Sequence, residues 1–142
     1  PAPGLFVEKW LNTEPVTLEQ YRGKVVLLQI GILLPNYPRH FERIEKALGK
    51  YGDKGLEVIA VHEPLRVTWA GKVTEEDIRA FIKKSKIKFP FGIDDPKHDL
   101  STHSAYNLKV TPALYLIDKK GMVRVSPKKD ELDKWIRLLL AE

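Results

Sequence analysis

A chain of 142 residues, 43% of them hydrophobic, is long enough to fold as one domain with a substantial core. Its net charge of +5 is spread as lysine mixed with acidic residues, and it has neither a nucleic-acid-binding motif nor an apolar run of membrane-spanning length, so we expect no nucleic acid partner and no membrane span. The absence of cysteine excludes a disulfide, a thiolate nucleophile and a cysteine-ligated metal site of its own. Scarce Asn, Gln and Met beside 30% charged residues are typical of thermophile proteins.

The first half of the chain predicts a β-α-β unit after an N-terminal extension of residues 1–15. The continuous apolar runs 25–30 and 56–62 predict strands that are buried on both faces of a sheet. Between them, apolar side chains recur at helical spacing and glycines follow, so we expect a helix there. The apolar positions of this helix are Phe41, Ile44, Ala47, Leu48 and Tyr51. Such a crossover between parallel strands is almost always right-handed.

The second half predicts two longer helices around three short strands. Thr74 precedes three acidic residues, which is the pattern of a helix N-cap with a favourable first turn. The remaining expected elements are a strand at 89–93, a helical turn from about Asp99 to Tyr106, an antiparallel hairpin at 113–118 and 122–126, and a last helix from about Lys128. Together these elements predict a single α/β domain, residues 1–142, with a mixed central sheet flanked by helices.

Three segments carry a resemblance to a known family: LEQYRGKVVLLQI, YGDKGLEVIAVH and YNLKVTPALYLIDKKGMV, in that order. Over roughly residues 16–140, the chain resembles the thioredoxin superfamily. Within it, the chain resembles the branch of TlpA-like thiol-disulfide oxidoreductases and of the alkyl hydroperoxide reductase and thiol-specific antioxidant (AhpC/TSA) group. The resemblance implies a thioredoxin-like fold with a cis-proline at Pro112. It leaves an extracytoplasmic or membrane-tethered location open, beside a cytoplasmic one, and related domains occur as parts of longer proteins.

Proline stands at both positions where this branch carries its redox cysteines. The family reads strand, then Trp-Cys-x-x-Cys, and here Leu34, Pro35, Asn36, Tyr37 and Pro38 occupy those places. The thiol chemistry needs a thiolate at a helix N-terminus and a second thiol that resolves the mixed disulfide. Proline supplies neither, so thiol redox catalysis by this chain is excluded. Pro38 also disfavours helical conformation at Tyr37, and we therefore expect the first long helix to begin at Pro38.

The resemblance places the Thr111-Pro112 pair against this degenerate turn, where the family pairs its backbone with an extended peptide. We therefore predict a non-catalytic binding module for a protein or extended peptide, without a cofactor. Its groove would comprise Leu33, Leu34, Pro35, Asn36, Tyr37, Pro38, Thr111, Pro112 and His62. Exposed apolar patches of this kind mark partner binding. Two alternatives stay open: Ile32 and Leu34 lie buried under the N-terminal segment, or Pro112 serves only its own turn.

Histidine residues suggest two further kinds of site. His62 and Glu63 end a strand at its carboxyl end, where α/β sheets place ligands, and an imidazole beside a carboxylate can act as a general base. Adjacent strand residues, however, point to opposite faces. His98 and His103 stand among aspartates that suit a divalent ion, yet the segment also has the pattern of a turn and helix cap, and we expect no metal. The alternative function is a family-level oxidoreductase or antioxidant role, or a cysteine-independent activity near His62.

Overall fold

The computed structural model describes residues 1–31, 37–62, 74–94, 102–106, 113–128 and 130–142. Within these ranges, six strands form one mixed sheet in the order β1-β4-β3-β2-β5-β6. The strands are β1 (Val7–Trp10), β2 (Val25–Gly31), β3 (Leu56–His62), β4 (Phe91–Asp94), β5 (Ala113–Ile117) and β6 (Val123–Val125). The helices are α1 (Tyr37–Tyr51), α2 (Glu75–Ser85), α3 (Thr102–Ala105) and α4 (Leu132–Leu140), with 3-10 turns η1 (Leu18–Tyr21) and η2 (Gly52–Lys54).

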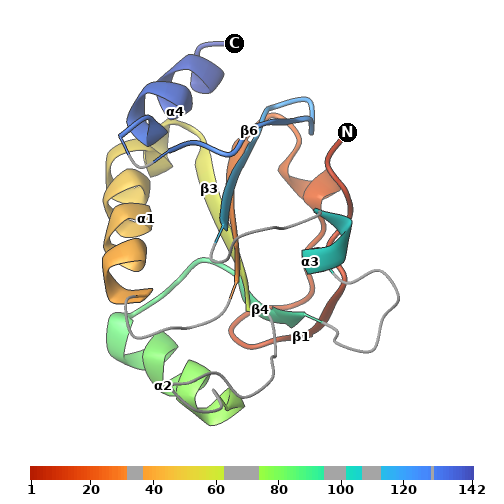
Figure 1. Ribbon diagram of the computed structural model, residues 1–142, viewed down its shortest axis with the longest axis vertical. Coiled ribbons are helices and arrows are strands. Elements are labelled where there is room, and N and C mark those ends of the chain that lie inside the picture. The colour runs from red at the N-terminus through yellow and green to blue at the C-terminus, as the bar shows by residue number, and fades with distance from the viewer. Residues whose placement is uncertain (32–36, 63–73, 95–101, 107–112, 129) are drawn as a thin grey trace.

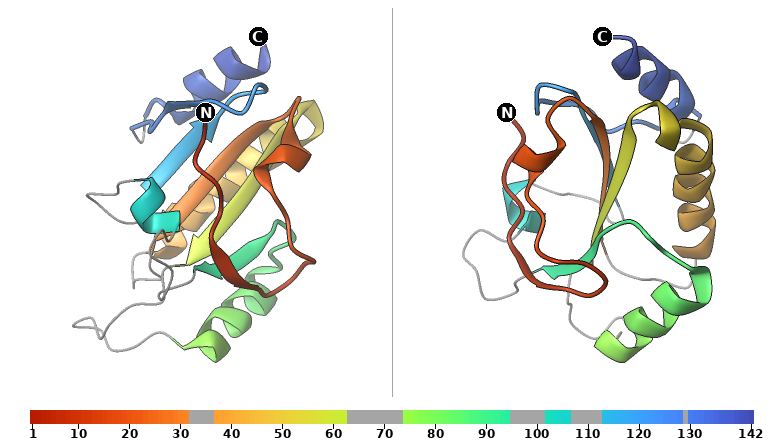
Figure 2. Two further views of the ribbon diagram at one scale, coloured as in Figure 1. Left: turned by 90° about the vertical axis from the view of Figure 1, so that its right-hand side faces the viewer. Right: turned by 180° about the vertical axis from the view of Figure 1, so that it is seen from behind.

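The sheet separates two layers. Helices α1, α2 and α4 cover one face, while α3 and the N-terminal segment lie on the other (Figures 1 and 2). The expected mixed sheet flanked by helices is therefore confirmed. Because side chains alternate between the two faces of a strand, the central strands contribute side chains to two separate hydrophobic clusters. The cluster under α1, α2 and α4 is the larger one, and it holds Leu27, Ile44, Val58, Phe91, Ile136 and Leu139.

The central strands β2 and β3 lie parallel and occupy the most buried part of the sheet. They pair in register from Val25 opposite Leu56 to Gly31 opposite His62. Every residue of β2 is buried, and β3 has only Glu57 partly exposed. The two continuous apolar runs of the sequence are thus confirmed as strands buried on both faces, because a strand with helices or loops on each side has no solvent-facing side chains.

The predicted N-terminus of α2 is also confirmed, and its cap explains it. The Thr74 hydroxyl accepts a hydrogen bond from the backbone N–H of Asp77 at 3.1 Å, and the Asp77 carboxylate accepts one from the backbone N–H of Thr74 at 2.9 Å. This reciprocal pair satisfies two backbone donors that have no partner within the helix. The hydrogen bond from the Thr74 backbone N–H, and next the Thr74 side chain, lower the pKa of Asp77, as expected for a carboxylate held in its charged form.

Several element boundaries differ from the sequence prediction, and the starts of α1, α4 and β4 are among them. Helix α1 begins at Tyr37, one residue earlier than expected. Helix α4 begins at Leu132 and not near Lys128, because a separate turn comes first, closed by the backbone N–H of Glu131 on the carbonyl of Lys128 at 2.9 Å. Strand β4 begins at Phe91 and not at residue 89. There the side chain of Asn12 takes the place of a neighbouring strand, bonding the Phe89 carbonyl at 2.8 Å and the Phe91 N–H at 2.9 Å.

Strand β1 packs closely over β4 because residue 92 has no side chain. A Cβ atom added at Gly92 would lie 2.6 Å from Val7 Cγ1 and 3.0 Å from Trp10 Cε3. We expect Gly92→Ala to lower the free energy of unfolding by about 1–3 kcal/mol, since overpacking of a close contact forces neighbours apart. Chemical denaturation measures this change. The matched control is Gly49→Ala in α1, where a Cβ meets nothing within 4 Å and the helix should gain about 0.5–1 kcal/mol. Equal effects of the two substitutions would contradict the prediction.

Candidate functional site

Three strand ends lie next to one another at one end of the sheet. Gly31, the last residue of β2, pairs with His62, the last residue of β3, and Ile30 pairs with Ala113, the first residue of β5. The last residues of β2 and β3 and the first residue of β5 therefore lie side by side on three neighbouring strands. The carboxyl ends of parallel strands are where α/β sheets bind their ligands. The described strand ends Gly31, His62 and Ala113 thus share one end of the sheet.

The apolar part of the predicted groove is not itself described. Leu33, Leu34, Pro35, Asn36, Thr111 and Pro112 lie outside the described residues, as does the expected cis-proline bond. Tyr37 and Pro38 are the first two residues of α1. The backbone N–H groups of a first helical turn have no acceptor within the helix, so this end of α1 offers hydrogen-bond donors and a positive dipole end.

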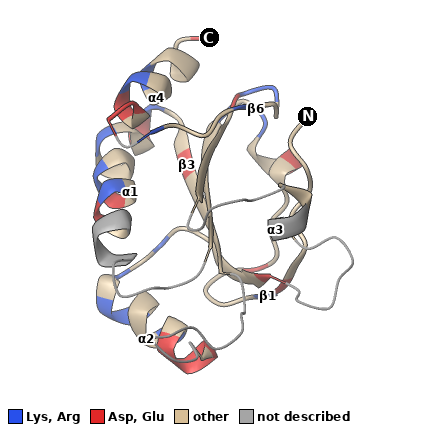
Figure 3. Cartoon of the chain, in the orientation of Figure 1, with Lys and Arg blue, Asp and Glu red and all other residues tan. Residues whose placement is uncertain are grey.

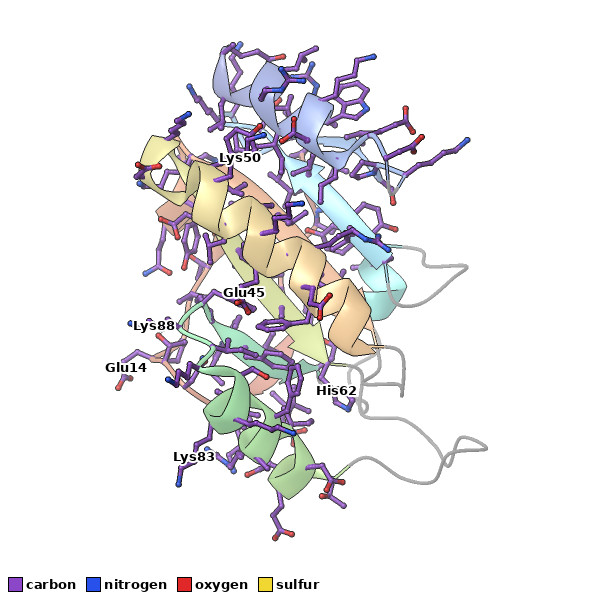
Figure 4. The ribbon with its side chains drawn as sticks, turned by 90° about the vertical axis from the view of Figure 1, so that its left-hand side faces the viewer. Glu14, Glu45, Lys50, His62, Lys83 and Lys88 are labelled. Carbon is purple, nitrogen blue, oxygen red and sulfur yellow. The ribbon has the colours of Figure 1, made fainter. Side chains whose placement is uncertain are left out.

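His62 is the best-defined side chain of the candidate site. It is only 3% exposed, and burial lowers the pKa of its imidazole from 6.5 to about 4. Within the part of the chain that the structure describes, its Nδ1 atom has no hydrogen-bond partner. In Figure 4 the ring lies at the end of β3, seen from the helix-covered face. At neutral pH this residue is thus an uncharged imidazole that carries one donor and one acceptor.

Gln29 is a second buried polar residue, which the sequence analysis did not single out. It is 1% exposed, and its side chain lies on the same face as that of Leu27, because residues two apart on a strand share a face. Gln29 lies opposite Ala60, two residues before the pair of Gly31 and His62. The available signal was a polar residue inside an otherwise apolar run. Gln29 and His62 bring polar groups to the helix-covered face near the ends of β2 and β3.

The aspartates of the segment considered for a metal have, where described, a structural partner. Asp94 is 1% exposed and accepts a hydrogen bond from the backbone N–H of Thr102 at 2.9 Å. The Thr102 hydroxyl in turn accepts one from the backbone N–H of Phe6 at 2.7 Å, which links the N-terminal segment to α3. Among the described residues no group of three His, Cys, Asp or Glu side chains could hold a metal ion. Glu63 and His98 fall outside them.

The described helices include none with the length and apolar composition needed to cross a bilayer. Comparisons with known proteins agree with the fold. The sequence model of the AhpC/TSA family matches residues 1–126. The solved structure of a thioredoxin-like superfamily protein superposes with a TM-score of 0.85 at 30% identity, covering 99% of this chain and 96% of that one. A thiol-disulfide isomerase from Corynebacterium glutamicum gives 0.80 at 29% identity, covering 100% and 97%.

Curated relatives are similar over most of this chain but are longer. Thiol-disulfide oxidoreductase ResA of Halalkalibacterium halodurans is 30% identical over 121 residues, which are 83% of this chain and 61% of that protein. Protein DipZ of Mycobacterium tuberculosis is 32% identical over 119 residues, which are 81% of this chain and 16% of that protein. The chain therefore spans less than two thirds of each. These matches confirm the resemblance and the thioredoxin-like fold predicted from sequence.

Proposed function

Because this chain belongs to the AhpC/TSA family and has a thioredoxin-like fold yet contains no cysteine, we propose that it is a redox-inactive binding module for a protein or an extended peptide. The observation that carries the proposal is that proline stands at positions 35 and 38, where the family has cysteine. The described residues nevertheless form the six-stranded sheet and the helix α1 around these positions. Thiol-disulfide exchange needs a thiolate to attack and a second thiol to resolve the product, and neither is present.

Binding survives the loss of the thiols for a physical reason. A protein that accepts an extended peptide as an added strand holds it through main-chain hydrogen bonds, and side-chain pockets add specificity. Neither contribution requires sulfur. The proposal is supported by the strand ends at Gly31, His62 and Ala113, which lie together at one end of the sheet. Proline at both cysteine positions removes the reaction and puts apolar side chains where the family has thiols.

His62 supports a role in binding better than a role in catalysis. A general base works best when its pKa lies near the working pH, and burial holds the pKa of His62 at about 4. Such an imidazole is a weak base at neutral pH. It remains a good neutral hydrogen-bond partner, and its Nδ1 has none among the described residues. A cysteine-independent activity at His62 is therefore the second candidate, behind recognition of a ligand group by the same ring.

The cysteine-free sequence permits a direct test by site-specific crosslinking. A Leu33→Cys variant would carry one thiol-reactive photocrosslinker, and we expect it to form discrete adducts in an extract of the organism that encodes the chain. A further Tyr37→Asp substitution is expected to weaken this capture roughly 30-fold, because aromatic anchors at interfaces commonly contribute about 2 kcal/mol. Adducts are quantified by mass spectrometry.

The matched control places the same crosslinker at Leu138→Cys on α4. Leu138 is an exposed leucine, 44% accessible, on a helix that lies outside the predicted groove. Adducts that occur only with the Leu33 probe and decline with Tyr37→Asp support the binding module. The same adducts from both positions, or none from Leu33, would count against a partner at the degenerate active site.

A further inference from the structure

A pocket of about 360 Å³ lies between the second half of α1 and the start of α4. Its lining residues are Arg43, Lys46, Ala47, Lys50, Tyr51, Leu132 and Asp133. None of them belongs to the predicted groove. Figure 4 shows Lys50 and His62 far apart on the helix-covered side of the molecule. The volume lies at the lower end of the range for small-molecule sites, about 300–1,000 Å³. What this pocket binds is thus a question separate from the proposed function.

Three cations line the pocket from one side of α1. Arg43, Lys46 and Lys50 follow one another at spacings of three and four residues, which places them on one face of the helix. Within the described ranges, no salt bridge joins Arg43 or Lys46 to a carboxylate, and this includes Glu42, which stands four residues before Lys46. Figure 3 shows basic residues on both α1 and α4, the two helices that form the pocket.

The acidic residue of the pocket, Asp133, already pairs with Lys50, Tyr51 and Arg137. The Asp133 carboxylate lies 2.9 Å from Lys50 Nζ, accepts a hydrogen bond from the Tyr51 hydroxyl at 2.5 Å, and lies 3.0 Å from Arg137 Nε. The Tyr51 hydrogen bond and the neighbouring Lys50 lower the pKa of Asp133, so it is ionised at neutral pH. Its charge is shared between Lys50 and Arg137. The positive charges of Arg43 and Lys46 are therefore left without a compensating carboxylate in this pocket.

The remaining lining is apolar and well packed. Leu132 and Tyr51 are 6% and 3% exposed, and with Ala47 they form the apolar part of the lining, here called the floor. We propose that the α1–α4 pocket binds a small organic anion, with its carboxylate or phosphate against Arg43 and Lys46 and its apolar part against this floor. Arginine suits either head group because its planar guanidinium can donate two parallel hydrogen bonds to an oxyanion. The apolar floor favours a ligand with a compact hydrophobic body over a bare inorganic ion.

Titration of the full chain by two-dimensional amide NMR tests this inference with four probes. The probes are phenyl phosphate, benzoate, inorganic phosphate and the neutral benzyl alcohol. We expect saturable shifts of amides in residues 43–51 and 132–137 with phenyl phosphate or benzoate, and weaker effects from phosphate and benzyl alcohol. The tighter of the two aromatic anions identifies the preferred head group. Saturation by inorganic phosphate at the same concentration, or no shift with either aromatic anion, would overturn the proposal.

Charge-neutralising variants separate the pocket from general electrostatics. Arg43→Gln with Lys46→Gln should weaken binding of the better anion about tenfold or more, which is about 1.4 kcal/mol or more, since both positive charges facing the head group are lost. The matched control is Lys83→Gln with Lys84→Gln on α2, which makes the same change in net charge away from the pocket. Unchanged affinity in the first variant, or equal loss in both, contradicts a defined site. Neither result depends on whether the groove near His62 binds a peptide.

Discussion

Replacing Pro35 and Pro38 with cysteine is expected to give this chain a dithiol-disulfide exchange activity that its own sequence cannot have. Strand β2 ends at Gly31 and α1 begins at Tyr37, so a thiol at position 35 would stand just before the helix. The unpaired N–H groups and dipole at a helix start lower a thiol pKa toward about 7, where about half is thiolate at neutral pH, against a few per cent for an ordinary cysteine. Reduction of insulin by dithiothreitol, followed by turbidity, measures the gain.

Two further variants make this result specific. Pro35→Ser with Pro38→Ser relaxes the backbone in the same way but supplies no thiol, and should match the inactive parent. Pro35→Cys alone should form mixed disulfides that turn over slowly, because no second thiol resolves them. A double-cysteine variant that folds but shows no activity above the serine control would refute the assignment of positions 35 and 38 to the family's cysteine sites. It would also remove the main support for a groove at this place.

The central strands could be predicted from sequence because their signal is local. The run 25–30 has apolar side chains on both faces and only one polar residue, Gln29, so it fits a strand covered on both faces, and the structure places it there. The start of α2 could be predicted for the same reason, since Thr74 and Asp77, three residues apart, cap each other. The start of β4 was different. It depends on the side chain of Asn12, nearly eighty residues earlier in the chain, which no local pattern reveals.

Some features of the candidate site could also be predicted from local sequence, and others could not. The replacement of both cysteines by Pro35 and Pro38 could be recognised from the sequence, because the family's motif has a fixed spacing. The burial of His62 was not, since it arises from neighbours on β2 and β4 that are distant in the chain. The α1–α4 pocket is the clearest case. The spacing of Arg43, Lys46 and Lys50 indicates a basic helix face, but only the packing of α4 against it adds Leu132 and Asp133 to the lining.

Acid is expected to destabilise this protein through His62, and His62→Gln should remove that effect. Burial lowers the pKa of His62 in the folded protein to about 4, from the ordinary histidine value of 6.5. Its flanking partners in the sheet, Gly31 and Ile93, carry no charge that could offset the penalty. Between these two pKa values the unfolded chain binds more protons than the folded one, so the free energy of unfolding decreases as the pH falls. The loss from pH 7.5 to pH 4 should be on the order of 3 kcal/mol.

The measurement is the difference in unfolding free energy between the parent and His62→Gln, taken by denaturant titration monitored through tryptophan fluorescence at several pH values. The difference isolates His62, because every other titratable group is present in both proteins. We expect it to be constant above about pH 7 and to shift in favour of the variant below that, as the parent loses its contribution. His62→Phe serves as a second non-titrating variant, in case glutamine is poorly accommodated. Parallel pH curves for the parent and both variants would show that His62 is protonated in the folded state as easily as in the unfolded one, which its 3% exposure argues against.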